Sequence, residues 1–419
     1  MIEVGQADRI LAENVALLPT YDCQLENAHG KVLREDIRAD RDQPPYHRVT
    51  MDGIAISTAA FDRGVRAFHR QGVQAAGRPP LRLTSPDGFI EVMTGGVLPE
   101  GCDAVIRIED VELRDATAFL EYDVSPTPMQ YVHLRGSDGV AGDVVLRKGV
   151  RLSPAHVAIA ASIGSSFLRV SSSPAVAVVS TGDELVELAS EVEEYQVRRS
   201  NVYAISAALS AGGYGEPNLC HVGDDRAALS SVLADLLDRC DLLVLTGGVS
   251  MGKFDFVSEV LAELGVENHI HRVRQRPGKP LWFGARGEKA VFALPGNPVS
   301  ALVCLYRYVL PYVERASGAP YRSPRRVRLS REAKTLPEFT RFLPVTLDSR
   351  AGELTASPVE INTSGDFLSL GGSDGFVELA PASQRVLKTQ SNRSDGVLAL
   401  TSQGAAAGAE VPFYSWRVT

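Results

Sequence analysis

Between residues 174 and 318, short apolar segments alternate with longer amphipathic ones, and this alternation constrains the fold more than any other feature of the chain. Strand candidates lie at 175–179, 242–245 and 291–294, and helix candidates at about 202–212, 225–238, 256–264 and 299–313. Short continuous apolar strands followed by amphipathic helices are typical of parallel sheets with helices on both faces. The pattern therefore predicts an open α/β domain.

Loops rich in glycine, proline and polar residues punctuate this domain. They read Ser180-Thr-Gly-Asp-Glu-Leu185, Thr246-Gly-Gly-Val-Ser-Met-Gly252, Pro277-Gly-Lys-Pro280 and Pro295-Gly-Asn-Pro-Val-Ser300. In open α/β sheets, ligands bind beyond the carboxyl ends of the strands, where adjacent glycines let backbone N–H groups approach a phosphate. Each loop alone is also compatible with an ordinary turn. Together they favour one crevice for a phosphorylated ligand, with Ser250 as an additional donor.

Several carboxylates occur in glycine-containing or turn-like surroundings. They are Asp52, Asp138, Glu184, Asp224 and Asp255. An exposed carboxylate commonly contacts only solvent, but one or two carboxylates with ligand phosphates are the oxygen ligands that Mg²⁺ binds. Arg276 and Lys279 are cations that can neutralise the same phosphates or an oxyanion. Because no Gly-x-Gly-x-x-Gly follows a strand, the pattern indicates phosphoryl or nucleotidyl release and argues against dinucleotide redox chemistry.

The rest of the chain predicts β-rich parts around this domain, in keeping with the about two to four domains that its length suggests. Residues 40–138 carry short apolar alternations between Gly and Pro, which are typical of a small β-rich domain. Ser153 predicts the N-cap of a helix over 155–162, followed by a strand over 167–170. We expect this piece to pack on a helical N-terminal segment, which would make the β-rich domain an insertion. Residues 319–419 predict a closing all-β domain.

Composition excludes several classes of function. A net charge of −8 and a pI near 5.6 argue against duplex DNA, so we predict no nucleic-acid partner. The five cysteines are widely spaced and never form Cys-x-x-Cys, which favours a reducing cytoplasm. No basic stretch followed by an apolar run begins the chain, and no apolar run approaches the roughly 18 residues of a membrane span. We therefore predict neither export nor a membrane partner.

Taken in order, the motifs are similar to those of a known family, the molybdopterin molybdenumtransferases of the MoeA and gephyrin E-domain group. The motifs are Met51-Asp-Gly53, Thr94-Gly-Gly-Val-Leu-Pro-Glu-Gly-Cys-Asp-Ala-Val105, Arg135-Gly-Ser-Asp138, Ser200-Asn201 and the four loops given above, with Asp255 after the loop that begins at Thr246. The resemblance runs nearly end to end. It implies a discontinuous linker domain over 1–38 and 139–173, an inserted β-rich domain over 39–138, a molybdopterin-binding open α/β domain over 174–318 and a C-terminal β-barrel over 319–419.

The resemblance also implies an activity in molybdenum cofactor biosynthesis. The family's reaction takes adenylylated molybdopterin and molybdate, requires Mg²⁺, releases AMP and yields molybdenum cofactor. The resemblance implies a homodimer, with the active cleft between the α/β domain of one subunit and the inserted domain of the other. Transient contacts with other enzymes of the same biosynthesis are also implied. Molybdate and tungstate have the same charge and nearly the same size, so the residues do not distinguish them.

By position in the family's motifs, the resemblance implies roles for individual residues. Catalytic roles fall on Asp52, Thr94, Asp138, Glu184, Asp255 and Lys279, with Glu184 and Asp255 at the metal. Substrate-binding roles fall on Thr181, Gly182, Asp224, Thr246, Gly247, Gly248, Ser250, Arg276, Pro295, Gly296, Asn297 and Pro298, and on Arg341 and Ser364 for molybdate. Asp225 is the alternative to Asp224 in a register shifted by one residue.

The chain departs from the family's usual pattern at several positions, which suggests a divergent branch. Tyr46-His-Arg-Val-Thr-Met51 replaces Phe-Asp-x-Ser-Ala-Met, Arg199 replaces an Asp before Ser-Asn, Arg276 replaces a Lys, and Phe342-Leu-Pro-Val345 replaces Phe-x-Arg-Gly.

Two other hypotheses compete with that of an enzyme that inserts molybdenum. A molybdopterin adenylyltransferase would ordinarily consist of the α/β domain alone. A non-catalytic dimeric scaffold like gephyrin would have no need of the motif carboxylates and Lys279.

Overall fold

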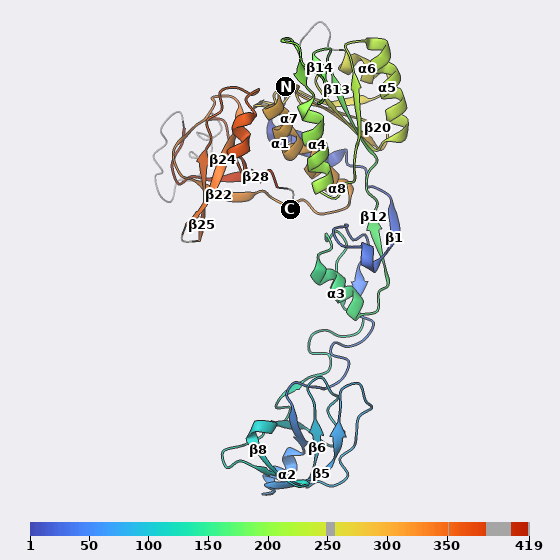
Figure 1. The fold of residues 1–419 in the computed structure, drawn as a ribbon, viewed down its shortest axis with the longest axis vertical. Helices are drawn as coiled ribbons and strands as arrows, with labels where there is room; N and C mark the ends of the chain where they lie inside the picture. The colour runs from blue at the N-terminus through green and yellow to red at the C-terminus, as the bar shows by residue number, and fades with distance from the viewer. Residues whose placement is uncertain (249–255, 351, 383–403, 418–419) are drawn as a thin grey trace.

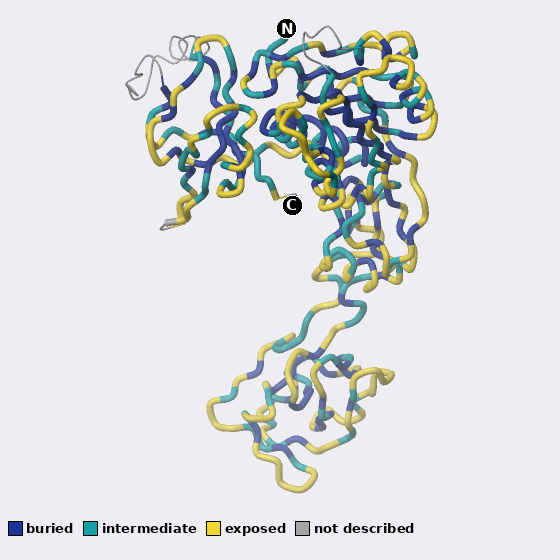
Figure 2. The backbone as a smooth tube through the Cα atoms, turned by 45° about the horizontal axis from the view of Figure 1, so that its top comes forward, coloured by how far each residue is buried: buried dark blue, intermediate teal, exposed yellow. Residues whose placement is uncertain are grey.

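The computed structural model describes residues 1–248, 256–350, 352–382 and 404–417, and the molecule is elongated (Figure 1). The α/β domain and the C-terminal barrel lie at one end, the inserted β-rich domain lies at the other, and a small connecting unit lies between them. Buried residues gather in each part (Figure 2), and the core of the α/β domain continues into the C-terminal domain through Phe342, Leu370 and Phe376. Within the described ranges, no helix is both long and apolar enough to cross a membrane.

The α/β domain is built on a six-stranded sheet. In spatial order its strands are β16 (Asn218–Val222), β13 (Val176–Thr181), β17 (Leu242–Thr246), β21 (Lys289–Leu294), β20 (Trp282–Arg286) and β18 (Glu267–His271). The first four strands are parallel, as predicted, whereas β20 pairs antiparallel with both β21 and β18. Only Gly287 and Glu288 join β20 to β21, and a connection this short forms a hairpin. The sheet is therefore mixed.

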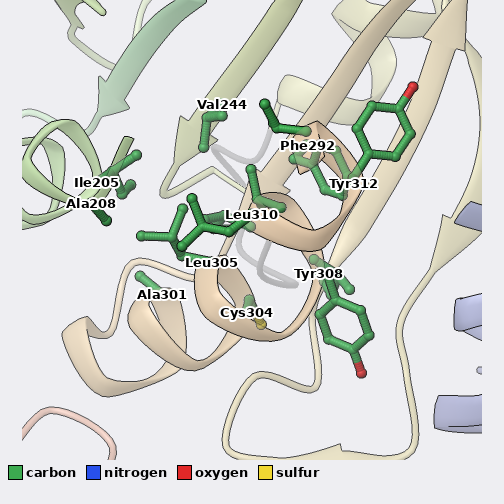
Figure 3. Close-up of a cluster of buried hydrophobic side chains, with 14 of the residues drawn as sticks. Ile205, Ala208, Val244, Phe292, Ala301, Cys304, Leu305, Tyr308, Leu310 and Tyr312 are labelled. Carbon is green, nitrogen blue, oxygen red and sulfur yellow. The ribbon is translucent and has the colours of Figure 1, made fainter. Parts of the chain in front are cut away.

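Helices cover both faces of this sheet, which confirms the predicted open α/β architecture. They are α4 (Ser200–Ala211), α5 (Arg226–Arg239), α6 (Val257–Glu263), α7 (Pro298–Cys304), a π-helical turn (Leu305–Val309) and α8 (Leu310–Ala316). Val178 of β13 lies in the core with α4, α7 and α8, and its neighbour Val179 lies in the core with α5 and α6. Successive strand side chains point to opposite faces, so one apolar strand serves both cores. Figure 3 shows Val244 and Phe292 of the sheet with Leu310 of α8 in the first core.

The N-terminal helix α1 (Val4–Glu13) belongs to the core of the α/β domain. Val4, Ala7 and Leu11 lie on one face of the helix and are buried in that core. The helix contacts β18 and α8. The prediction that residues 155–170 pack on this helix is therefore wrong, because the apolar face of α1 is already covered by the α/β domain.

The connecting unit is formed by two separated stretches of chain. It contains β1 (Thr20–Gln24), a 3₁₀ turn (Leu25–Asn27), β2 (Ile37–Arg38), β11 (Val144–Leu146), α3 (Pro154–Ser162) and β12 (Phe167–Ser171). β1 pairs antiparallel with β12, and β2 with β11. Ser153 caps α3 as predicted, because its Oγ accepts a hydrogen bond from the backbone N–H of His156 at 3.4 Å. The chain leaves this unit and returns to it, so the β-rich domain is an insertion.

The inserted domain is β-rich, as predicted. Its sheet contains, in spatial order, β7 (Ala104–Arg107), β4 (Gly53–Ile56), β6 (Gly88–Val92), β5 (Ala67–Gln74), β9 (Thr117–Leu120) and β8 (Val111–Arg114). A short helix α2 (Thr58–Asp62), a 3₁₀ turn (Ile108–Asp110) and a separate strand pair, β3 (Arg48–Val49) with β10 (Val132–His133), complete it. Ile54, Phe68 and Phe89 are buried in its core.

Strands of the C-terminal domain close into a barrel, as the resemblance implies. In order of pairing they are β24 (Thr340–Arg350), β25 (Glu353–Pro358), β22 (Arg325–Leu329), β28 (Glu410–Ser415) and β26 (Gly375–Leu379), and β26 pairs back with β24. A further pair, β23 (Ala333–Lys334) with β27 (Gly404–Ala405), and a 3₁₀ turn (Leu368–Gly372) lie beside them. From the α/β domain, β19 (Gln275–Arg276) adds to β24 in parallel, which attaches the barrel to that domain.

Candidate functional site

A cavity of about 960 Å³ opens at the carboxyl ends of β13, β17 and β21. This volume lies at the upper end of the roughly 300–1,000 Å³ that small-molecule sites occupy. The predicted residues that line it are Thr181, Gly182, Glu184, Asp224, Thr246, Gly247, Gly248, Pro295, Gly296, Asn297 and Pro298. They come from loops that follow different parallel strands. The structure therefore brings these loops together at one crevice.

Gly247 and Gly248, which follow β17, occupy backbone conformations that favour glycine. Their φ angles are +93° and +65°. A Cβ on Gly247 would lie 2.8 Å from Thr181 Oγ1, and one on Gly248 would lie 2.4 Å from Val257 Cγ2. The N–H of Gly247 donates to Leu294 O at 3.1 Å, which holds the turn against β21. Glycine is therefore required here so that the turn can pack against β13 and α6 at the edge of the cavity.

Asn201 holds the start of α4 at the cavity. Its Nδ2 donates to Thr246 Oγ1 at 2.9 Å and to Gly296 O at 2.8 Å. Ser200 and Asn201, the first residues of α4, both line the cavity. The N-terminus of a helix carries a partial positive charge that favours anions. This end of α4 therefore favours an anionic group in the cavity.

Two of the predicted carboxylates, Glu184 and Asp224, line the same cavity. The Glu184 carboxylate lies over Gly182, where an added Cβ would be 2.4 Å from Glu184 Oε2. Asp225, the alternative to Asp224, is instead the N-cap of α5, because its Oδ1 accepts from the backbone N–H of Ala228 at 2.7 Å. The structure thus favours Asp224 over Asp225 as the residue that faces a ligand.

Few groups in the described chain could complete a metal site. No cluster of three or more His, Cys, Asp or Glu residues with suitable geometry occurs in the described ranges. Glu184 and Asp224 are therefore a sparse donor set, which fits a Mg²⁺ ion that keeps water and phosphate ligands. The predicted Ser250 and Asp255 lie outside the described residues.

The predicted cations lie near the junction of the α/β domain with the barrel. Lys279 and Arg276 are exposed, and their segment contributes Pro280 to the cavity lining. Pairing of β19 with β24 places Arg276 opposite Arg341 in register. The Arg276 guanidinium lies 5.1 Å from the centroid of the Phe339 ring. Arg341 is partly buried, and this burial lowers the pKa of its guanidinium.

Ser364 connects the barrel domain to the cavity wall. Its Oγ accepts a hydrogen bond from Asn297 Nδ2 at 2.8 Å, and its carbonyl accepts from the Val299 N–H at 3.2 Å. Gly365 and Phe367 of the same loop line the cavity. The cavity is therefore shared between the α/β domain and the C-terminal domain.

The remaining predicted residues, Asp52, Thr94 and Asp138, lie in the inserted domain. Asp52 Oδ1 accepts from the Thr94 N–H at 2.7 Å and from Thr94 Oγ1 at 2.9 Å, and these bonds hold the pKa of the Asp52 carboxyl below its usual value. Asp138 Oδ1 lies 2.8 Å from His133 Nε2, and His133 Nδ1 lies 2.9 Å from Arg48 Nη2. Figure 1 shows the inserted domain at the end of the molecule away from the α/β domain. These residues therefore do not reach the cavity of their own chain.

The structure adds to the cavity a segment that sequence reasoning did not assign to it. β14 (Leu185–Val186) and β15 (Val197–Arg198) pair in parallel. Gln196 of the loop between them and Arg199 after β15 line the cavity. The sequence marks Arg199 as a departure from the family's pattern, and its burial becomes evident only in the folded chain.

Comparisons with known proteins cover nearly the whole chain. Residues 2–164 match the family model described as the MoeA N-terminal region (domain I and II). Residues 177–315 match that of a probable molybdopterin binding domain, and residues 326–388 that of the MoeA C-terminal region (domain IV). The order of these matches is the order of the parts observed in the structure.

Relatives and solved structures agree with these matches. A molybdopterin molybdenumtransferase of Synechocystis is 36% identical, over 99% of this chain and 100% of the relative. One of Haemophilus influenzae is 30% identical, over 84% of each chain. The crystal structure of the molybdopterin biosynthesis MoeA protein from Pyrococcus horikoshii OT3 is 25% identical, covers 99% of this chain and 100% of its own, and has a TM-score of 0.76. The chain therefore belongs to the MoeA family of molybdopterin molybdenumtransferases.

Proposed function

We propose that this chain inserts molybdenum into molybdopterin during molybdenum cofactor biosynthesis, taking adenylylated molybdopterin and molybdate, releasing AMP and requiring Mg²⁺. The observation that most supports this proposal is the cavity at the carboxyl ends of the parallel strands. It lies in the domain that matches a probable molybdopterin binding domain, and it combines a glycine turn with carboxylates. The relatives cited above carry the name of this activity.

The α/β domain supplies the features that bind phosphate groups. The turn at Gly247 and Gly248 lines the cavity, and the first turn of α4 at Ser200 and Asn201 favours negative charge. Glu184 and Asp224 would hold Mg²⁺ together with ligand phosphates. The ion would neutralise charge that develops on the phosphate leaving group. Asp255, which lies outside the described residues, is proposed as a further ligand.

Molybdate is a tetrahedral oxyanion and needs cations and hydrogen-bond donors. The junction between the α/β domain and the barrel gathers Arg276 and Arg341 in register, and Ser364 in contact with Asn297. Lys279 lies three residues after Arg276 in the same segment. We place molybdate at this junction, where the dithiolene sulfurs of molybdopterin supply the ligands of the incorporated metal.

A homodimer with a shared cleft is part of the proposal. Asp52, Thr94 and Asp138 lie in a domain that is remote from the cavity of the same chain. Such a group can contribute to a cavity only if a second copy presents it, as symmetric dimers permit. Transient contact with other enzymes of cofactor biosynthesis and a cytoplasmic location complete the proposal.

The test is an insertion assay with adenylylated molybdopterin, Mg²⁺ and molybdate. Wild type should form AMP and active cofactor, Asp52→Ala and Glu184→Ala should each lose activity, and the exposed control Glu288→Ala should match wild type. A mixture of the two inactive variants should regain activity, because a mixed dimer has one cleft with both residues intact. Failure of wild type to exceed a blank would contradict the enzyme. Inactivity of a verified mixed dimer would contradict the shared cleft.

The adenylyltransferase hypothesis predicts a different product. That enzyme would form adenylylated molybdopterin from ATP and molybdopterin without using molybdate. We expect no such product from this chain, because its matches extend through the N-terminal region and the C-terminal region of the MoeA family. Product analysis by mass spectrometry separates the two reactions, and accumulation of the adenylylated form from ATP would favour the adenylyltransferase.

A further inference from the structure

Arg199 is a charged side chain that the fold buries at the wall of the cavity. It follows β15 and is the N-cap of α4, and its backbone N–H donates to Val186 O at 3.1 Å. Only 8% of its side chain is exposed, yet it is one of the residues that line the cavity. A buried guanidinium needs partners, because an ion without hydrogen bonds is unfavourable in a protein interior.

The described part of the protein supplies hydrogen-bond partners for only part of this guanidinium. Nη2 donates to both carboxylate oxygens of Glu187. Nε is buried and has no hydrogen-bond partner in the described part of the chain. Thr181 Oγ1 is likewise buried and without a partner among the described residues. Arg199 Nε is closed off from the cavity in this conformation, but Arg199 lines the cavity, so a turn of its side chain would bring this unused donor to a bound group.

The neighbouring arginine has a different role. Arg198 Nε donates to Leu188 O at 2.8 Å, and its Nη2 donates to Ser190 O at 3.3 Å. Arg198 thus holds the loop between β14 and β15.

The carboxylates of the described lining, Glu184 and Asp224, would repel an anionic ligand. A cation on this wall would add to the neutralisation that Mg²⁺ on these carboxylates would supply.

We propose that Arg199 is a further substrate-binding residue, which donates its Nε–H to an anionic oxygen of the ligand's pyrophosphate. The inference rests on the proposed function, because that function supplies the pyrophosphate. A guanidinium matches the oxygen geometry of phosphate groups and keeps its charge when buried.

Glu187 competes with the ligand for this guanidinium. Its side chain is 62% exposed, so water solvates the carboxylate readily when Arg199 turns to a phosphate. Removal of the Glu187 charge should leave Arg199 free for the ligand. We therefore expect opposite effects from the two residues. Removal of the Arg199 charge should weaken the binding of the phosphorylated ligand, and removal of the Glu187 charge should strengthen it.

The test compares ADP with adenosine by isothermal titration calorimetry at one fixed Mg²⁺ concentration, because the two probes differ only in the diphosphate. Wild type should bind ADP more tightly. Arg199→Gln should reduce the ratio of the two affinities by roughly 10- to 100-fold, the size expected for one charge-assisted hydrogen bond. Arg199→Lys should retain part of the ratio, and Glu187→Gln should raise it. The control Arg239→Gln makes the same charge change at an exposed residue and should leave the ratio unchanged.

An unchanged ratio in Arg199→Gln would overturn the inference, and so would an equal loss of both probes, which would mean that Arg199 only supports the fold. If Arg199→Gln does not fold, Glu187→Gln decides, since a ratio at or below that of wild type overturns the inference. The insertion assay separates this result from the proposed function. A chain that prefers ADP through Arg199 but inserts no molybdenum keeps the inference and loses the function, and the reverse outcome removes the inference alone.

Discussion

Asn201 donates a hydrogen bond from its Nδ2 to Thr246 Oγ1 at 2.9 Å, and this bond joins the start of α4 to the end of β17. The same nitrogen donates to Gly296 O at 2.8 Å. Thr246 is buried, and its Oγ1 donates to Pro295 O at 3.4 Å. One amide side chain thus connects two of the loops that form the cavity.

Replacement of Asn201 by Ala should loosen this connection. Two hydrogen bonds are lost, and the expected loss of stability is about 1–2 kcal/mol. Thermal unfolding should show a lower Tm, and calorimetry should show weaker binding of phosphorylated ligand. The control is Asn218→Ala, which removes an exposed amide at the start of β16. Equal melting of the two variants would contradict a connecting role for Asn201.

Replacement of Thr94 by Val should raise the pKa of Asp52. The Thr94 N–H and hydroxyl both stabilise the ionised carboxylate and lower its pKa. Val removes the hydroxyl and keeps the N–H, so the pKa should rise part of the way toward the usual value. Any stability or activity that depends on ionised Asp52 is present at higher pH and is lost as pH falls through its pKa. That loss should begin at a higher pH in the variant.

Carbon-13 NMR titration of the Asp52 carboxyl measures this shift directly. The matched control is Thr50→Val, because the Thr50 hydroxyl donates to Tyr131 O at 2.9 Å and makes no hydrogen bond to Asp52. Its Asp52 pKa should equal that of wild type. A Thr94→Val titration that coincides with wild type would show that the hydroxyl does not hold the carboxylate in solution.

Replacement of Gly278 by Ala should destabilise the loop before β20. Gly278 has a φ of +90°, and a Cβ there would lie 2.6 Å from Cys304 Sγ and 2.7 Å from Gln275 Nε2. Gly265 has a similar φ of +79°, but a Cβ there meets nothing within 4 Å. Both changes strain the backbone, and only Gly278→Ala also crowds buried neighbours. It should cost about 1–3 kcal/mol more than Gly265→Ala in denaturant unfolding. Equal costs would mean that the core adjusts freely.

Cys102 should be unreactive in the folded protein, although it lies within the motif that begins at Thr94. Burial raises the pKa of its thiol to about 12, so roughly one thiol in 10⁴ is ionised at pH 8, and the thiolate is the reactive form. Iodoacetamide should modify Cys102 slowly in the native state and rapidly after unfolding, as followed by peptide mass spectrometry. Partly exposed Cys220 should react before it. Rapid native labelling of Cys102 with loss of insertion activity would contradict a purely structural thiol.

Much of the α/β domain could be predicted because its signals are local. A run such as 175–179 is apolar at every position, and a strand with two buried faces needs this pattern. The Ser153 cap and the helix after it depend on neighbours only a few residues away. Gly247 and Gly248 likewise mark a turn, whatever the rest of the chain does. The strand-end loops then meet because parallel strands end at one edge of a sheet.

Other features depend on contacts between residues that are distant in sequence. The apolar face of α1 is visible in the sequence, but its partner is not, and the expected packing on residues 155–170 is wrong. β19 joins the barrel by pairing with β24, although the residues of these two strands do not by themselves specify that pairing. An apolar stripe along a helix indicates only that this face of the helix must be buried, and several surfaces of the protein could bury it.

The sequence by itself determined three central strands and most helices of the α/β domain, the positions of its glycine turns and the motif order that indicates the family. Tertiary structure decided which side chains share a cavity. Glu184 and Asp224 lie in its wall, whereas Asp52 lies at the far end of the molecule. The same holds for Arg199, which the sequence marks only as a departure from a motif and which becomes a buried donor in the fold. Residue type and spacing set local conformation, but burial and the charges around a side chain arise only when distant segments pack together.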